Sequence, residues 1–136
     1  MKRVCVLVVL SLFAVACGVR SAAALPPVNV QWHEKYSALK DAVVKTYGEK
    51  STAKCNVCHV EGKGKKEKNE YGLTVGKFVT KAEIAKIKEA AGDDSDAAAE
   101  ATKKYILEGL GKAEAEKCAS GATFGDLIKA GKLPSE

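Results

Sequence analysis

Two cysteines and a histidine stand close together near the middle of the chain: Cys55, Cys58 and His59. In the spacing Cys-x-x-Cys-His, both thiols can add across the vinyl groups of one porphyrin as thioethers. The adjacent imidazole then presents a ring nitrogen to the iron from one side. The motif therefore predicts one covalently attached haem c, with His59 as the proximal iron ligand.

The first 24 residues have the layout of a secretory signal peptide. Lys2 and Arg3 precede an apolar run over residues 4–19, and alanines at positions 22–24 offer a cleavage site. Covalent haem attachment belongs to the outer side of an energy-transducing membrane, so the export signal and the motif support each other. We expect an exported protein, in the periplasm or an equivalent extracytoplasmic compartment, with one mature domain over residues 25–136.

Membrane attachment and nucleic-acid binding are both disfavoured. The apolar run is shorter than the ~20 residues that span a bilayer, and no later segment is apolar enough, so stable membrane insertion is not expected. Lipoprotein processing at Cys17, after Ala14-Val15-Ala16, stays open as an alternative to cleavage after Ala24. Removal of residues 1–24 lowers the formal net charge from +5 to +2, which does not favour a nucleic-acid partner.

A Cys-x-x-Cys pair has three other common uses: a zinc site, a thioredoxin-like redox couple and a structural disulfide. Zinc needs two more ligands, and outside the motif the mature chain offers only Cys118, His33 and carboxylates. A redox couple should follow a strand in a βαβ unit, whereas the flanking residues here have the pattern of helix and polar loop. These uses stay open beside the haem hypothesis.

The elements that must position the motif are predicted to be helices. Apolar residues recur at helical spacing before the motif and predict one helix ending at Gly48: Trp32, Tyr36, Leu39, Val43 and Tyr47. After His59, a charged loop over residues 60–68 is expected to be solvated and mobile. Asn69 can then cap a short helical turn.

Capping signals predict the next two helices. Thr80 and Glu83 form a capping-box pattern for a helix that runs through Ala91 and stops at Gly92. Acidic residues over 93–96 then begin a long alanine-rich helix, where the helix dipole favours negative charge.

The C-terminal part is expected to be helical too. Gly109 and Gly111 have low helix propensity, so the long helix is expected to break there and resume through residue 117. Thr123 and Asp126 form a second capping-box pattern for a short last helix. The mature chain is therefore predicted to be all-α.

An N-terminal helix, an early Cys-x-x-Cys-His motif and a C-terminal helix resemble the monohaem c-type cytochromes. The resemblance implies a small all-α domain of about four to five helices wrapped around one covalent haem. It implies electron transfer with a redox partner protein, rather than catalysis. Aromatic residues are candidates to line the haem: Trp32, Tyr36, Tyr47, Tyr71 and Phe78.

The chain departs from this family at the sixth iron ligand. Common members supply a methionine from a loop before the last helix, but the sole methionine here is Met1. Cys118 stands where that methionine would lie. It is also the one cysteine of the predicted mature chain outside the motif, and iron ligation would account for this unpaired thiol, so we predict Cys118 as the distal ligand. His33 is the rival, and a position left open, or filled by water or another side chain, is the third alternative.

A His59/Cys118 pair is similar to the small His/Cys-ligated c-type cytochromes of anaerobic ammonium-oxidising bacteria. That resemblance implies a low reduction potential, a homodimer or a heterodimer with another small cytochrome, and an anammoxosome-type lumen as the compartment. It also implies an alternative function, an NO- or CO-binding sensor, carrier or scavenger whose distal ligand is displaced on reduction. The lysines over 63–68 are available to steer an acidic redox partner.

Overall fold

A computed structural model describes residues 28–64 and 66–135. The predicted signal peptide, its cleavage site and Cys17 lie outside this range. Within it, regular structure is helical, and β-pairing is limited to two isolated bridges. The elements are α1 (Val28–Lys35), η1 (Ser37–Leu39), α2 (Lys40–Tyr47), η2 (Ser51–Cys55), α3 (Glu70–Phe78), α4 (Lys81–Ala91), α5 (Ser95–Ala115) and α6 (Phe124–Lys129), where η marks a 3-10 helix. The predicted all-α class is confirmed.

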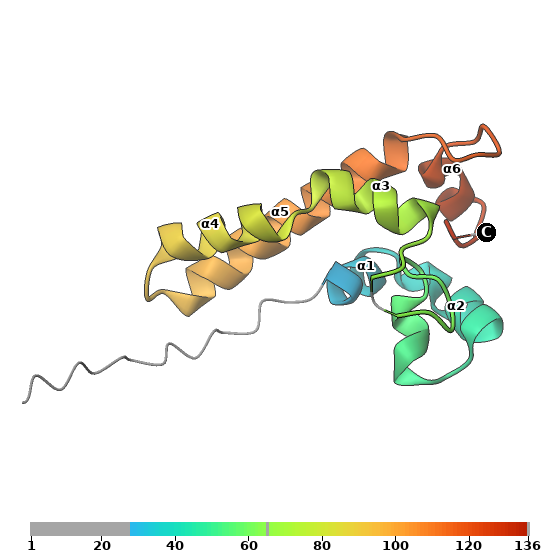
Figure 1. Cartoon of the computed structure of the whole chain (residues 1–136), viewed down its shortest axis with the longest axis horizontal. Coiled ribbons are helices and arrows are strands. Elements are labelled where there is room, and N and C mark those ends of the chain that lie inside the picture. Colours follow the sequence, from blue (N-terminus) through green and yellow to red (C-terminus); the bar gives the residue numbers. More distant parts are fainter. Residues whose placement is uncertain (1–27, 65, 136) are drawn as a thin grey trace, which may run out of the picture.

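Helix α5 is the axis on which four of the other helices pack (Figure 1). Helices α1, α3, α4 and α6 all contact it, with α4 and α3 following one another along its length. Its buried residues share one helical face, with spacings of three or four residues apart from the adjacent pair Gly109 and Leu110: Ala98, Thr102, Ile106, Gly109, Leu110 and Ala113. None of the helices that the structure describes is both long and apolar enough to cross a membrane.

The predicted break at Gly109 and Gly111 is wrong. Helix α5 runs without interruption from Ser95 to Ala115. A Cβ added at Gly109 would lie only 2.4 Å from Cγ2 of Val79, so this glycine allows the connection between α3 and α4 to approach closely. Packing against the neighbouring segment outweighs the low helix propensity of glycine.

The single helix predicted before the motif is divided. Helix α1 ends at Lys35, and the chain bends at Tyr36 (φ −112°, ψ 46°) before η1 and α2. The apolar stripe is buried on both sides of the bend, but α1 packs mainly on α5, whereas α2 packs on η2, which α1 also contacts. Two different packing partners explain the bend, and α2 ends at Gly48 (φ 80°) as predicted.

The predicted helix starts are confirmed. Side-chain oxygens of Asn69, Thr80, Asp94 and Thr123 accept backbone N–H groups at the starts of α3, α4, α5 and α6. Thr123 and Asp126 make the full reciprocal capping box, whereas Thr80 makes only its own half of the pattern.

The hydrophobic core lies where α1, α3, α5 and α6 meet. Its largest fully buried side chains are Trp32, Tyr71, Ile106, Leu110, Phe124 and Leu133. The rings of Tyr71 and Phe124 pack with their centroids 5.1 Å apart. The first turn of α3 therefore links the core, through Tyr71, to the Cys-x-x-Cys-His segment, against which the same turn lies.

Candidate haem attachment site

The Cys-x-x-Cys-His segment is a tight turn between η2 and α3. Cys55 is the last residue of η2, and its carbonyl oxygen accepts the backbone N–H groups of Cys58 at 3.1 Å and His59 at 3.0 Å. This turn places the two thiols and the imidazole on one short loop of backbone.

Asn69, the N-cap of α3, binds the outside of this turn. Its side-chain Nδ2 donates to the carbonyls of the two residues between the cysteines, Asn56 at 3.1 Å and Val57 at 3.0 Å. Its backbone N–H donates to the carbonyl of Cys58 at 3.2 Å. Since the carbonyl of Cys55 accepts two N–H groups of the turn itself, each backbone carbonyl from residue 55 to residue 58 accepts a hydrogen bond. The sequence indicated the cap but not these bonds, because the carbonyls that a side chain reaches depend on the fold.

Gly72 lets the first turn of α3 press against the motif. A Cβ added there would lie 1.9 Å from the carbonyl oxygen of Cys58, well inside any tolerable contact. The N–H of Gly72 also donates to Oδ1 of Asn69 at 2.8 Å. Sequence reasoning missed this residue, since a glycine near a helix start carries no signal of close approach.

The two motif thiols are free, with no disulfide between them. Burial raises the pKa of the Cys58 thiol to about 12, and the nearby Lys68 charge opposes that rise only in part. A thiol with a raised pKa is protonated at neutral pH, and the thiol is a weaker nucleophile than the thiolate.

The His59 ring has no hydrogen-bond partner among the described residues, and its Nδ1 atom is buried. The backbone on either side of it is fixed by the bond to Cys55 and by an isolated bridge to Lys68. A ring nitrogen not engaged by protein is available to a metal.

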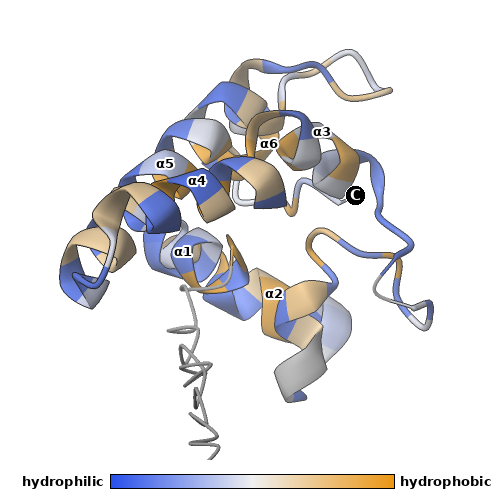
Figure 2. Ribbon diagram, turned by 60° about the vertical axis from the view of Figure 1, so that its left-hand side comes forward, coloured by the Kyte–Doolittle hydropathy of each residue, from blue (hydrophilic) through white to orange (hydrophobic). Residues whose placement is uncertain are grey.

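The segment from Val60 to Lys68 returns to the motif as a closed loop. The N–H of Val60 donates to the carbonyl of Glu67 at 3.1 Å. Its described residues are all exposed, as predicted, and the loop projects as a largely hydrophilic segment between η2 and α3 (Figure 2).

Aromatic side chains lie behind the motif. Nε1 of Trp32 donates to the hydroxyl of Tyr71 at 3.1 Å, and the hydroxyl of Tyr36 donates to Glu114 at 2.5 Å. Burial raises the pKa of Tyr71, and the nearby Cys58 thiol adds to that rise, which places Tyr71 beside the motif. These three aromatic residues are buried core residues, while Tyr47 and Phe78 are partly buried.

His33 lies next to the backbone that leads into Cys55. Its Nε2 is 3.3 Å from the carbonyl oxygen of Lys54, and its ring meets the edge of Trp32. Burial lowers the pKa of His33; the contact with the Lys54 carbonyl opposes that decrease, and the Lys54 charge adds to it. The structure thus brings the rival distal candidate close to the motif as a neutral imidazole at neutral pH.

Cys118 lies in the connection between α5 and α6. Its sulfur is 3.0 Å from Oγ of Ser120 and 3.2 Å from the carbonyl oxygen of Ala122, and its N–H donates to the same carbonyl at 2.9 Å. Both ribbon views place this connection away from η2, with α3 and α6 between (Figures 1 and 2). No hydrogen bond, disulfide or electrostatic interaction joins Cys118 to Cys55, Cys58 or His59 among the described residues.

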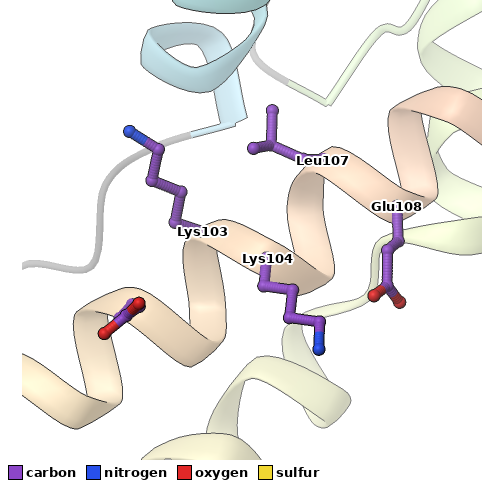
Figure 3. Close-up of a pocket in the computed structure, with 5 residues that line it drawn as sticks. Lys103, Lys104, Leu107 and Glu108 are labelled. Atoms are coloured by element: carbon purple, nitrogen blue, oxygen red, sulfur yellow. The ribbon is translucent and has the colours of Figure 1, made fainter.

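A hollow on the outer face of α5 contains none of the motif residues (Figure 3). It is lined by Glu100, Lys103, Lys104, Leu107 and Glu108. One of its charges is paired, because Nζ of Lys103 donates to Glu34 of α1 at 3.0 Å. This hollow is separate from the candidate site.

No family model, curated protein or solved structure matches the chain. No relative therefore assigns a role to the residues of this site.

Proposed function

We propose that the chain is an exported monohaem c-type cytochrome that transfers electrons through a haem attached at Cys55 and Cys58, with His59 as the proximal ligand. The observation that carries the proposal is the shape of the motif turn, in which two thiols outside any disulfide stand in one short stretch with an imidazole whose buried Nδ1 has no hydrogen-bond partner among the described residues. A haem held there would supply one-electron exchange between ferric and ferrous iron.

The residues around the turn have supporting roles in this proposal. Trp32 and Tyr71 exclude water from the buried side of the motif, and a low-polarity surrounding is one of the determinants of haem potential. The lysines of the exposed loop after His59 would steer an acidic redox partner.

Zinc binding is the weaker interpretation of the same residues. A structural zinc site needs four converging ligands, and the described residues contain no group of three or more His, Cys, Asp or Glu side chains able to hold a metal ion. A haem iron has a lower requirement, because the porphyrin supplies four nitrogens and the protein one or two ligands.

For the sixth iron position, sequence and geometry point to different residues. The sequence favours Cys118, and in that case its turn would have to give up the bonds of the sulfur to Ser120 and Ala122. His33 is the alternative, because it already lies beside the residue that precedes Cys55.

The hydrogen-bonded Cys118 turn also favours a second candidate function, binding of NO or CO. If the sulfur kept its bonds to Ser120 and Ala122, a bound haem would have its distal position open to a diatomic ligand. If the sulfur instead bound the iron, reduction would weaken that bond and NO or CO could displace it. In this version the protein is a gas sensor, carrier or scavenger.

The cytochrome proposal is tested by expressing the full-length chain in a bacterial host with haem-attachment machinery. Haem staining after denaturing electrophoresis should detect covalent haem in the wild-type chain and in a Cys118→Ala control. It should detect none in a Cys55→Ala, Cys58→Ala double variant. A wild-type chain without covalent haem would contradict the proposal.

The two functions are then separated by adding CO to the dithionite-reduced holoprotein. No CO adduct supports a closed electron carrier, whereas a stable adduct supports gas binding. The same titration on the His33→Asn and Cys118→Ser variants identifies the residue that competes with CO, since removal of a competing ligand raises CO affinity.

A further inference from the structure

We propose that Asn69 is a positioning residue for the haem. Together with Gly72 it fixes the turn that carries both thioether links, and through that turn the orientation of the His59 ring at the iron. This inference rests on the proposed function, since it concerns how a haem attached at the motif is presented.

Asn69 binds the motif more extensively than helix capping requires. A cap needs one side-chain oxygen, and Oδ1 of Asn69 provides it to the N–H of Gly72. The two Nδ2 hydrogens are not needed for the cap, yet they donate to the carbonyls of Asn56 and Val57. The Asn69 side chain and backbone together hold three successive carbonyls of the motif.

The position of Asn69 is in turn fixed by the rest of the fold. Helix α3 packs on α5, and the connection that follows α3 is held against α5 at the contact between Val79 and Gly109. At the other end of α3, the absence of a side chain at Gly72 allows the carbonyl of Cys58 to lie against the helix. The turn is therefore shaped by its contacts with the start of α3.

His59 takes its direction from this turn. Its N–H is bonded to the carbonyl of Cys55, and the carbonyl just before it, that of Cys58, is bonded to Asn69. The His59 ring itself has no hydrogen bond to a described residue that would orient it. Metal-ligating histidines are usually oriented by a hydrogen bond to the second ring nitrogen. Here the bonded backbone on either side of the His59 side chain fixes the point and direction from which the ring extends.

The test uses the full-length holoprotein with two variants, Asn69→Asp and Asn69→Ser. Both keep an oxygen that can cap α3, and both lose the two Nδ2–H donors. Thr80→Ala is the matched control, because it removes the cap of α4 and touches no motif residue. The readouts are the yield of covalent haem, the reduction potential, and the haem-methyl NMR shifts of the ferric protein, which report the orientation of the axial imidazole plane.

We expect both Asn69 variants to change the haem-methyl shift pattern, shift the potential and lower the yield of covalent haem several-fold. Thr80→Ala should keep the wild-type pattern, potential and yield while lowering thermal stability. The proposal is also supported if the Asn69 variants carry no covalent haem while the Thr80→Ala control carries the normal amount.

Two outcomes would overturn it. In the first, both Asn69 variants keep the wild-type shift pattern. In the second, Thr80→Ala loses haem as completely as they do, so that Asn69 acts through stability alone. A wild-type chain without covalent haem is a different failure, because it removes the proposed function itself.

Discussion

The turns that carry Cys58 and Cys118 differ in what holds them. The motif turn has bonds of its own to the carbonyl of Cys55 and is also held from outside, by Asn69 and Gly72 at the start of α3, which lie more than ten residues further along the chain. The Cys118 turn is held from within, by Ser120 and Ala122 and by a bridge between Lys117 and Thr123. A turn fixed by another helix has its place set by the whole fold, whereas a self-contained turn can shift as a unit without breaking its own bonds.

The largest expected effect tests the motif side of this comparison. Replacing Gly72 by alanine puts a methyl group into the carbonyl of Cys58, so either α3 or the motif must move. Overpacking of this kind costs about 1–3 kcal/mol or more in the free energy of unfolding, measured by urea denaturation followed by circular dichroism.

The control for this variant is Gly111→Ala. Gly111 is exposed in the interior of α5, and the nearest atom to an added Cβ is Nζ of the flexible Lys35 side chain at 3.7 Å. Alanine there should stabilise the protein by about 0.5–1 kcal/mol through helix propensity. Equal stability of Gly72→Ala and the wild type would show that α3 does not hold the motif.

A smaller effect is expected at the other turn. In Cys118→Ser the hydroxyl can replace the sulfur in both hydrogen bonds, so the free energy of unfolding should change by about 1 kcal/mol or less. If Cys118 binds iron, the ferric spectrum of the holoprotein should lose its thiolate character. An unchanged spectrum with unchanged stability would assign this sulfur to the turn alone.

The smallest effect concerns Glu114, on the part of α5 that leads to the Cys118 turn. Burial by itself raises the pKa of this carboxyl, but hydrogen bonds from Lys35 and Tyr36 and the charges of Lys35 and Lys129 bring it below its ordinary value. A lowered folded-state pKa stabilises the protein above the unfolded-state value of 4.5, and this contribution is lost as the pH falls through the folded-state pKa.

Acid titration of unfolding measures this contribution. Compared with Glu114→Gln, the wild type should be more stable by about 0.5–1 kcal/mol at pH 6–7, a modest value because the side chain is 28% exposed. The difference should shrink below pH ~5. If the free energies of unfolding of the two proteins, plotted against pH, ran parallel down to pH ~3, the ion pair with Lys35 would contribute nothing to folding.

Local signals in the sequence were sufficient for much of this fold. Helix caps act within three residues, so Asn69, Asp94 and Thr123 indicated the starts of α3, α5 and α6 correctly. The same holds for Gly48, whose positive φ ends α2. The identity of the motif residues is also local, although haem attachment to them stays a prediction.

The predictions that failed concern features that depend on contacts between distant segments. The bend at Tyr36 arises because α1 and α2 pack on different partners, and α5 continues through Gly109 because Val79 lies against it. The clamp by Asn69 is of the same kind, whereas the bonds of Cys118 to Ser120 and Ala122 are local. Residue spacing predicts which side of a helix is apolar, but not which segment will cover it.

The closed loop after His59 has a consequence for how such a protein can diversify. Its ends are joined by the bridge between His59 and Lys68 and by the bond from Val60 to Glu67, and Asn69 follows at once. Lengthening a loop whose ends are already paired costs only about 0.6 kcal/mol for each doubling. Insertions near Gly62 and Gly64 are therefore tolerable in energetic terms, so the surface beside His59 can acquire a new recognition segment while the Cys-x-x-Cys-His turn keeps its geometry.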